Sequence, residues 1–315
     1  MRAVVVGAGA IGGVVGARLA RAGHDVLLIA RGTHGVAIAR DGLRLRTPDE
    51  ELILHIPVAP AIEAAVPRAD DVLLLCVKGQ DTAAAVDALA RVWPRATPIA
   101  CLQNGVANER TAATRFERVI PVHVMCPTTY LVPGVVEAPC TPVTGLLDVG
   151  PGGEALAAAF RASTFRATVR ADVMRWKYAK LISNLANAVE AAVGLAGRGL
   201  AIARAAQDEG RACLTAAGIP WASDAEVAAL DDGWLVVRPI GGVTRPGGSS
   251  WQSLARGTGS IEAAYLNGEI VALGAAHGVA TPVNAGLLRV AQAMASSHTP
   301  PGTFTEAALL AAVAG

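Results

Sequence analysis

The chain has 315 residues and a formal net charge of +1, so its length suggests two domains and its charge favours neither nucleic acid nor an anionic membrane as a partner. Hydrophobic residues make up 52% of it, but no uninterrupted apolar run reaches the roughly eighteen residues of a membrane span. The five cysteines and six histidines form no C-x-x-C or H-E-x-x-H pattern, which argues against a disulfide framework and predicts no metal site.

The chain opens with a β–α–β pattern. Residues 3–6 predict a strand, residues 14–23 a helix and residues 25–30 a second strand, with G-x-G-x-x-G between the first strand and the helix. Such glycines allow a tight turn and let the backbone approach a pyrophosphate at the helix N-terminus. The pattern predicts that a dinucleotide binds the turn formed by Gly7, Ala8, Gly9, Ala10, Ile11 and Gly12. The apolar run before the glycines is too short for a signal peptide, so a cytoplasmic protein is expected.

The end of the second strand predicts which cofactor binds. NAD and FAD sites usually place a carboxylate there for the ribose hydroxyl, whereas this chain has Arg31. A guanidinium is well shaped to hold a 2′-phosphate, so NADP is predicted, with NADPH preferred over NADH. The alternative is an exposed arginine in a turn.

Two further apolar runs end in polar residues. Residues 72–77 are followed by Lys78, and residues 98–102 are followed by Gln103 and Asn104. Near-continuous apolar strands suit a parallel sheet that is buried on both faces, and ligands bind such sheets beyond the carboxyl ends of the strands. Lys78 and Asn104 are therefore expected to share one crevice with the glycine turn. The alternative is ordinary loop chemistry, since Asn-Gly is a common turn.

The pattern changes beyond residue 119. Residues 119–150 contain short β-like runs broken by Pro and Gly, which predict a meander that extends the sheet. A helix at residues 153–161 and a strand at residues 167–169 are expected to complete this part. The predicted fold is an α/β Rossmann-type dinucleotide-binding domain, residues 1–170, followed by an all-α C-terminal domain, residues 171–315.

The second half opens with the segment WKYAKLISNLANAV, residues 176–189, which predicts one helix. Lys177, Lys180, Asn184 and Asn187 are spaced by three, four and three residues, so they share one stripe of a helix that is otherwise apolar. A buried lysine with a lowered pKa can transfer protons near neutral pH. The stripe therefore predicts catalytic chemistry in a cleft, by either lysine; the alternative is a seam that faces solvent.

More helices are predicted towards the C-terminus. Residues 199–217 and 224–230 each predict a helix, and a loop rich in Gly and Pro then ends at Ser249-Ser250, which is expected to cap a short helix.

A long helix is predicted at residues 261–278, with Ser260 as its cap and Glu262 in its first turn. Glu262 is a candidate for the site; the alternative is that it only complements the helix dipole.

Together these motifs resemble the ketopantoate reductases (2-dehydropantoate 2-reductases), nearly end to end. The K-x-x-x-N element is shared with 3-hydroxyacid dehydrogenases, but a serine pair followed twelve residues later by a glutamate is narrower. The matching elements are GAGAIGG, Arg31, Lys78, L-Q-N-G around Asn104, K-L-x-x-N at residues 180–184, Ser249-Ser250, and Glu262 in I-E-x-x-Y-L-N-G-E.

The resemblance implies an enzyme that uses NADPH to reduce 2-dehydropantoate to pantoate, with hydride delivered to the C2 carbonyl. It implies that Lys180 is the proton donor, whereas Lys177, nearer the helix start, is expected to reach solvent with its long stem. It further implies the following contacts: Asn184, Asn187, Ser250 and Glu262 with the substrate, and the glycine turn, Arg31, Lys78, Asn104 and Glu262 with the cofactor. Asn187 follows Asn184 by three residues, where the family usually has four.

Three departures border the expected substrate pocket: Trp251 stands where the family often has methionine, Ala264 stands where it often has aspartate, and the Gly- and Pro-rich segment before Ser249 is longer than in compact members. One alternative is therefore an NADPH-dependent reductase of another 2-keto acid or related carbonyl compound. Another is a non-catalytic NADP-sensing protein, which has no need of a buried Lys180 and Glu262. A small keto acid is the expected partner, and a homodimer is left open.

Overall fold

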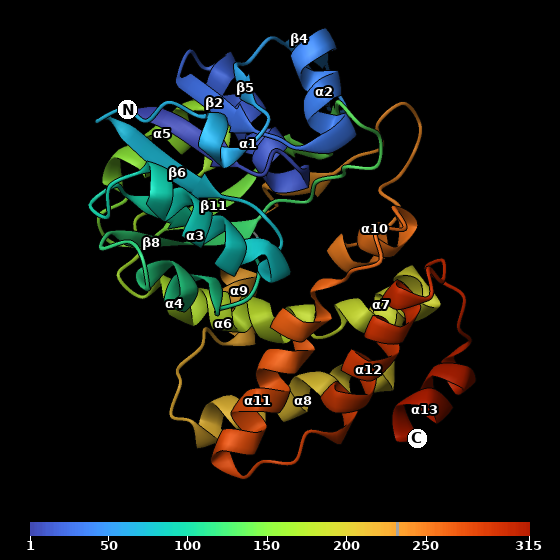
Figure 1. Ribbon diagram of the computed structural model, residues 1–315. Helices are drawn as coiled ribbons and strands as arrows, with labels where there is room; N and C mark the ends of the chain where they lie inside the picture. The colour runs from blue at the N-terminus through green and yellow to red at the C-terminus, as the bar shows by residue number, and fades with distance from the viewer. Residues whose placement is uncertain (231–232) are drawn as a thin grey trace. The chain divides into compact units, whose positions relative to one another are not determined.

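The computed structural model describes residues 1–230 and 233–315 (Figure 1). The chain forms two compact units. The first comprises Met1–Lys177 and Ala225–Arg245, and the second comprises Tyr178–Asp224 and Pro246–Gly315.

An eight-stranded sheet forms the centre of the first unit. From β8 to β5 all neighbouring strands are parallel; β11 runs antiparallel to β8, and β12 runs parallel to β11. In spatial order the strands are β12 (Phe165–Arg166), β11 (Gly145–Val149), β8 (Val119–Met125), β7 (Ile99–Cys101), β6 (Asp71–Leu75), β1 (Arg2–Val6), β2 (Asp25–Ile29) and β5 (Val58–Ala59).

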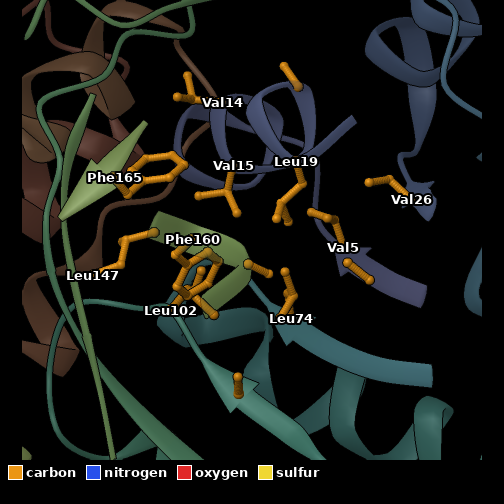
Figure 2. Packing of buried hydrophobic residues seen from close by; sticks show 14 of the residues in the cluster. Val5, Val14, Val15, Leu19, Val26, Leu74, Leu102, Leu147, Phe160 and Phe165 are labelled. Atoms are coloured by element: carbon orange, nitrogen blue, oxygen red, sulfur yellow. The ribbon is translucent and has the colours of Figure 1, made fainter. Parts of the chain in front are cut away.

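Helices cover both faces of this sheet, as its apolar strands predicted. On one face, α1 (Ala10–Arg21) and α5 (Glu154–Ala162) contribute Val15, Leu19 and Phe160 to a buried cluster, shown in Figure 2. On the other face lie α3 (Thr82–Val92) and α4 (Asn108–Ala113). Alternate residues of each strand therefore enter different clusters, Val5 with α1 and Val6 with α3.

Smaller elements complete the first unit. They are α2 (Gly32–Asp41), the three-stranded sheet β4 (Glu51–Leu54), β3 (Leu43–Arg46) and β9 (Val135–Glu137), the 3-10 turns η1 (Ile62–Ala64) and η2 (Gly79–Asp81), and the two-stranded sheet β10 (Cys140–Pro142) and β13 (Leu235–Val237). The predicted meander is therefore correct for β8 and β11 but wrong for β9 and β10, which pair in the smaller sheets. The strand predicted at residues 167–169 is replaced by β12, with Val169 in an isolated bridge to Val149.

The boundary at residue 170 differs from the division in the structure in two ways. The first unit runs on to Lys177, because that side chain is buried among strands of the sheet. Residues 225–245, assigned by the sequence to the all-α domain, return to the first unit because β13 pairs with β10 and Arg238 binds Asp49 at 2.6 Å.

The second unit is helical. Its elements are α6 (Val173–Asn184, which begins in the first unit), α7 (Asn187–Val193), η3 (Leu195–Gly199), α8 (Ala201–Ala216), α10 (Ser249–Ala255), η4 (Glu262–Tyr265), α11 (Asn267–His277), α12 (Pro282–Ser296) and α13 (Glu306–Ala314). Helix α9 (Asp224–Leu230), predicted at these residues, starts where the chain re-enters the first unit. No helix among the described residues is long and apolar enough to span a membrane.

Two predicted helices of the second half are each divided. The segment 176–189 breaks between α6 and α7, where Asn267 Nδ2 donates to the Leu185 carbonyl at 3.2 Å. The helix predicted at 261–278 is the 3-10 turn η4 followed by α11, because Leu266 adopts φ −120° and ψ −87° between them. Ser260 is therefore not the cap of a long helix. The serine pair does not cap α10 either, since Gly248 is its N-cap and the serines are its first two residues.

Candidate active site

The glycine turn joins β1 to α1, and its three motif glycines lack side chains for different reasons. Gly7 has φ +95°, a left-handed conformation that favours glycine. A Cβ on Gly12 would lie 2.1 Å from the Gly7 carbonyl oxygen, so packing requires glycine there. Gly9, the N-cap of α1, has φ −68°, and a Cβ on it would meet only Tyr130, at 3.9 Å. Neither conformation nor packing requires glycine at position 9, which leaves space beside its backbone for a ligand.

The buried side chain of His34, in the first turn of α2, holds this turn. The N–H of Gly134 donates to His34 Nδ1 at 2.9 Å, so the ring proton lies on Nε2. Nε2 donates to the Ala8 carbonyl oxygen at 2.7 Å. Burial lowers the pKa of His34, which keeps the imidazole neutral and this arrangement intact. The role of His34 was not predicted from the sequence, because a single histidine outside any motif has no spacing partner.

Arg31 lies where β2 gives way to α2. It is the exposed N-cap of α2, in an extended conformation. The N–H of Gly7 donates to the Ile29 carbonyl at 3.1 Å, so the end of β2 is directly linked to the glycine turn. Arg31 and the glycine turn therefore follow neighbouring strand ends.

The loops that carry Lys78 and Asn104 meet at the same edge. A Cβ on Gly7 would lie 3.0 Å from Val77, the residue before Lys78. The side-chain amide of Gln103, the residue before Asn104, donates to the Val77 carbonyl at 2.9 Å. The loops that follow β1, β6 and β7 are therefore in contact with one another. The predicted cofactor residues Lys78 and Asn104 lie in two of these loops.

Lys177 contradicts the expectation that its stem reaches solvent. Its side chain is only 3% exposed, and Nζ lies 2.6 Å from Glu109 Oε1. Nζ also donates to the Gln103 carbonyl at 3.1 Å and to the Val122 carbonyl at 3.3 Å. The expectation was wrong because the loop after β7, strand β8 and helix α4 supply buried acceptors that no local sequence pattern reveals.

Lys180 and Asn184 lie on the last turns of α6, in the second unit. They are four residues apart, so they lie one above the other on one face of the helix. Lys180 is half-buried and Asn184 is buried. Asn187 does not continue their stripe, because it lies beyond the break and begins α7.

Asn187 belongs to a polar cluster within the second unit. Arg198 Nη1 donates to Asn187 Oδ1 at 2.6 Å and to Glu190 Oε2 at 2.9 Å. The Glu190 carboxylate, which is buried, also accepts the N–H of Gly248 at 2.5 Å. Since Gly248 is the N-cap of α10, this ion pair fixes both Asn187 and the start of the helix that carries the buried Ser250.

Glu262 is the first residue of η4 and is 5% exposed. Five residues later, Asn267 donates to the Leu185 carbonyl, so this segment is tied to the turn that follows Asn184. A four-residue 3-10 turn carries little macrodipole, which weakens the dipole explanation for an acid here. In the described parts of the chain, no group of three or more His, Cys, Asp or Glu side chains is arranged to hold a metal ion.

Comparisons with known proteins identify the family. The family model described as "Ketopantoate reductase PanE/ApbA" matches residues 3–141, and "Ketopantoate reductase PanE/ApbA C terminal" matches residues 172–295. A 2-dehydropantoate 2-reductase from Caulobacter vibrioides is 32% identical over 304 residues, which cover 92% of this chain and 98% of that protein. The chain belongs to the ketopantoate reductase family.

Other ketopantoate reductases and a related fold agree with this. The 2-dehydropantoate 2-reductase of Pyrococcus horikoshii is 32% identical over 192 residues, which cover 59% of this chain and 62% of that protein. A crystal structure of a PanE/ApbA family ketopantoate reductase from Ralstonia eutropha JMP134 has a TM-score of 0.79 at 31% identity, covering 95% of this chain and 99% of that one. A D-mandelate dehydrogenase structure with NADH and anilino(oxo)acetate has a TM-score of 0.78 at 21% identity with the same coverage, a likeness of fold alone.

Membership of the ketopantoate reductase family confirms two predictions made from the sequence. The fold is a parallel-sheet α/β domain with a helical C-terminal domain. The chain is an oxidoreductase that acts on a CH–OH group.

Proposed function

We propose that the chain catalyses the NADPH-dependent reduction of 2-dehydropantoate to pantoate. The observation that carries the proposal is the glycine turn with open space at Gly9, in a member of the ketopantoate reductase family. An N-cap backbone without a side chain allows a pyrophosphate to approach a helix N-terminus.

Two features of the first unit support a dinucleotide phosphate as the ligand. Helix α1 has no side-chain cap, and its first turn contains no acidic residue, so nothing on α1 itself competes with an anion. Arg31, exposed after β2, supplies a guanidinium where NAD sites usually have a carboxylate, which favours the 2′-phosphate of NADPH. Lys78 and Asn104, beyond β6 and β7, are proposed as further cofactor contacts.

For the chemical step, a bound nicotinamide supplies the hydride to C2 of the substrate. We assign proton donation to the carbonyl oxygen to Nζ of Lys180, whose charge also stabilises that oxygen as it becomes negative. The state of Lys177 supports this choice, because its buried ammonium is hydrogen-bonded to two backbone carbonyls and paired with the Glu109 carboxylate.

The remaining polar residues are proposed to hold the substrate. Ser250, at the start of α10, would bind the carboxylate, and Asn184 and Glu262 would bind the developing hydroxyl, with Glu262 also near the nicotinamide. All three side chains are buried, so a substrate held by them would be shielded from bulk water. Because Asn187 Oδ1 accepts from Arg198, we propose only the amide N–H groups of Asn187 for the substrate.

One observation favours a second candidate, the reduction of a different 2-keto acid. A Cβ on Gly247 would lie 2.4 Å from the Trp251 side chain, so Trp251 is packed against the backbone at the start of α10. We infer that a bulky indole one residue from Ser250 would change the space available to a substrate side chain.

The test is oxidation of NADPH across a panel of 2-keto acids that includes 2-dehydropantoate. We expect the highest kcat/KM for 2-dehydropantoate, and we expect Lys180→Ala to lower turnover about a hundredfold or more while NADPH binding is kept. A higher kcat/KM for another 2-keto acid would establish the second candidate. NADPH binding without turnover of any member would favour the non-catalytic NADP sensor. A cytoplasmic location and a homodimer stay predictions; light scattering on the same preparation measures the latter.

A further inference from the structure

The buried ammonium of Lys177 occupies the place where two strands of the sheet separate. Strands β7 and β8 are paired as far as Cys101 and Pro121. Just beyond that pair, the carbonyls of Gln103 and Val122 both accept from Lys177 Nζ instead of bonding across the ladder. Lys177 therefore replaces strand-to-strand hydrogen bonds at the carboxyl end of β7.

Glu109 of α4 completes the surroundings of this ammonium. Its carboxylate lies 2.6 Å from Nζ, and its side chain is 11% exposed. Lys177 Nζ is therefore held by two hydrogen bonds, to Gln103 and Val122, and by the ion pair with Glu109. The geometry thus fixes the position of Nζ, and through it the position of the Gln103 carbonyl.

Gln103 in turn is bonded to the two loops that are proposed to bind the cofactor. Its side-chain amide donates to the Val77 carbonyl at 2.9 Å, directly before Lys78, and to Thr82 Oγ1 at 2.7 Å. Its backbone leads directly into Asn104. A displacement of Gln103 would therefore move Lys78 and Asn104 together.

A second chain of hydrogen bonds closes this network. Thr82 Oγ1 donates to Asn108 Oδ1 at 2.8 Å, and Asn108 Nδ2 donates to the Asn104 carbonyl at 2.9 Å. Thr82, Gln103 and Asn108 are all buried, so water does not compete with these bonds. Asn104 is held from both sides by groups that depend on where Gln103 lies.

We propose that Lys177 is a positioning residue for cofactor binding: with Glu109 it fixes the Gln103 carbonyl and so sets the loops that carry Lys78 and Asn104. This inference rests on the proposed function only in taking those loops as the cofactor site. Replacing Lys177 leaves the carbonyls of Gln103 and Val122 without this hydrogen-bond donor, so some loss of stability is expected whatever the role of the pair. A role in positioning predicts, in addition, a loss of cofactor affinity that an equally disruptive change elsewhere does not cause.

The experiment compares two double variants by NADPH titration, followed by protein fluorescence, and by thermal melting. In Lys177→Met/Glu109→Leu the volumes are kept and the three polar contacts are lost. The control is Arg2→Met/Asp71→Asn, which alters a buried ion pair of 2.7 Å at the first residues of β1 and β6, the opposite strand ends from the glycine turn.

We expect both variants to melt earlier than the wild type, but only the Lys177 variant to bind NADPH about tenfold to a hundredfold more weakly. The control should bind NADPH as the wild type does. Unchanged NADPH affinity in the Lys177 variant would overturn the proposal, and so would an equal loss in the control, which would indicate general loosening.

If the Lys177 double variant does not fold, Glu109→Gln decides by the same two measurements, since it keeps an acceptor but removes the charge. These titrations need no substrate. A failure of the wild type to reduce any 2-keto acid would therefore refute the proposed function and leave the comparison at Lys177 intact.

Discussion

The variants Gly9→Ala and Gly12→Ala distinguish a glycine that leaves space for a ligand from a glycine that packing requires. The two changes add the same methyl group, three residues apart, to the same segment. At Gly12 the new carbon would lie 2.1 Å from the Gly7 carbonyl oxygen and 2.9 Å from Val5. At Gly9 it would lie 3.9 Å from the nearest atom, a ring carbon of Tyr130, which is an ordinary van der Waals distance.

These distances set the expected magnitudes. Because the Gly7 carbonyl is backbone, Gly12→Ala can be accommodated only by moving β1 away from α1, and overpacking of this kind costs about 3 kcal/mol or more. For a folding unit of about 200 residues that lowers the melting temperature by roughly 6–12 °C. Gly9→Ala should change stability by less than about 1 kcal/mol in either direction, since its backbone is already extended and the unfolded chain loses entropy.

The cofactor should respond in the opposite way. A methyl group at Gly9 occupies the space proposed for the pyrophosphate, and loss of one charge-assisted hydrogen bond costs about 1.5–3 kcal/mol. The Kd for NADPH should therefore rise about ten- to a hundredfold in Gly9→Ala. Melting curves and NADPH titrations of both variants are the assay. Gly9→Ala protein that binds NADPH like the wild type would refute the assignment of this turn to the phosphates.

Three further predictions follow from side chains around the site. Arg31→Ala should weaken NADPH binding about ten- to a hundredfold and leave NADH little changed, because only the 2′-phosphate contact is lost; an equal loss for both in parallel titrations would contradict it. Glu262→Gln keeps the shape of the side chain and removes its charge, so kcat should fall while the melting temperature moves little; normal kcat with a large drop in melting temperature would restore a purely structural role. Burial lowers the pKa of His34 in the folded state, so the unfolded chain binds a proton at His34 more tightly. The contribution of neutral His34 to the free energy of unfolding is therefore fully present above about pH 6.5 and is lost as the pH falls below it. His34→Gln should flatten the fall of melting temperature below about pH 6.5, and an unchanged slope would assign that fall to other groups.

The parts of the fold that the sequence predicted correctly depend on local patterns. The apolar runs at β1, β6 and β7 and the glycines after β1 report burial and close backbone approach within a few residues of chain. That is why the two-domain class and the strand-end position of Lys78 and Asn104 followed from spacing alone. Their roles in binding remain predictions.

The errors come from partners that are distant in sequence. The helix predicted at residues 176–189 is divided at Leu185, whose carbonyl accepts a hydrogen bond from Asn267, 82 residues further along the chain. Lys177 is buried because its ammonium pairs with Glu109 and donates to the carbonyls of Gln103 and Val122. Glu190 and Arg198 went unnoticed because their pairing joins α7 to η3, and neither residue lies in a motif.

Because residues 225–245 return to the first unit, the chain cannot be divided into two independent folding fragments by a single cut. The polypeptide passes between the two units three times, after Lys177, Asp224 and Arg245. A fragment that stops at residue 177 would lack β13 and leave β10 with an open edge, which invites aggregation. Shuffling of domains among family members should therefore exchange residues 225–245 together with the N-terminal half. A cut between the two matched sequence segments, within residues 142–171, would leave residues 225–245 on the C-terminal piece, although they fold with the N-terminal one.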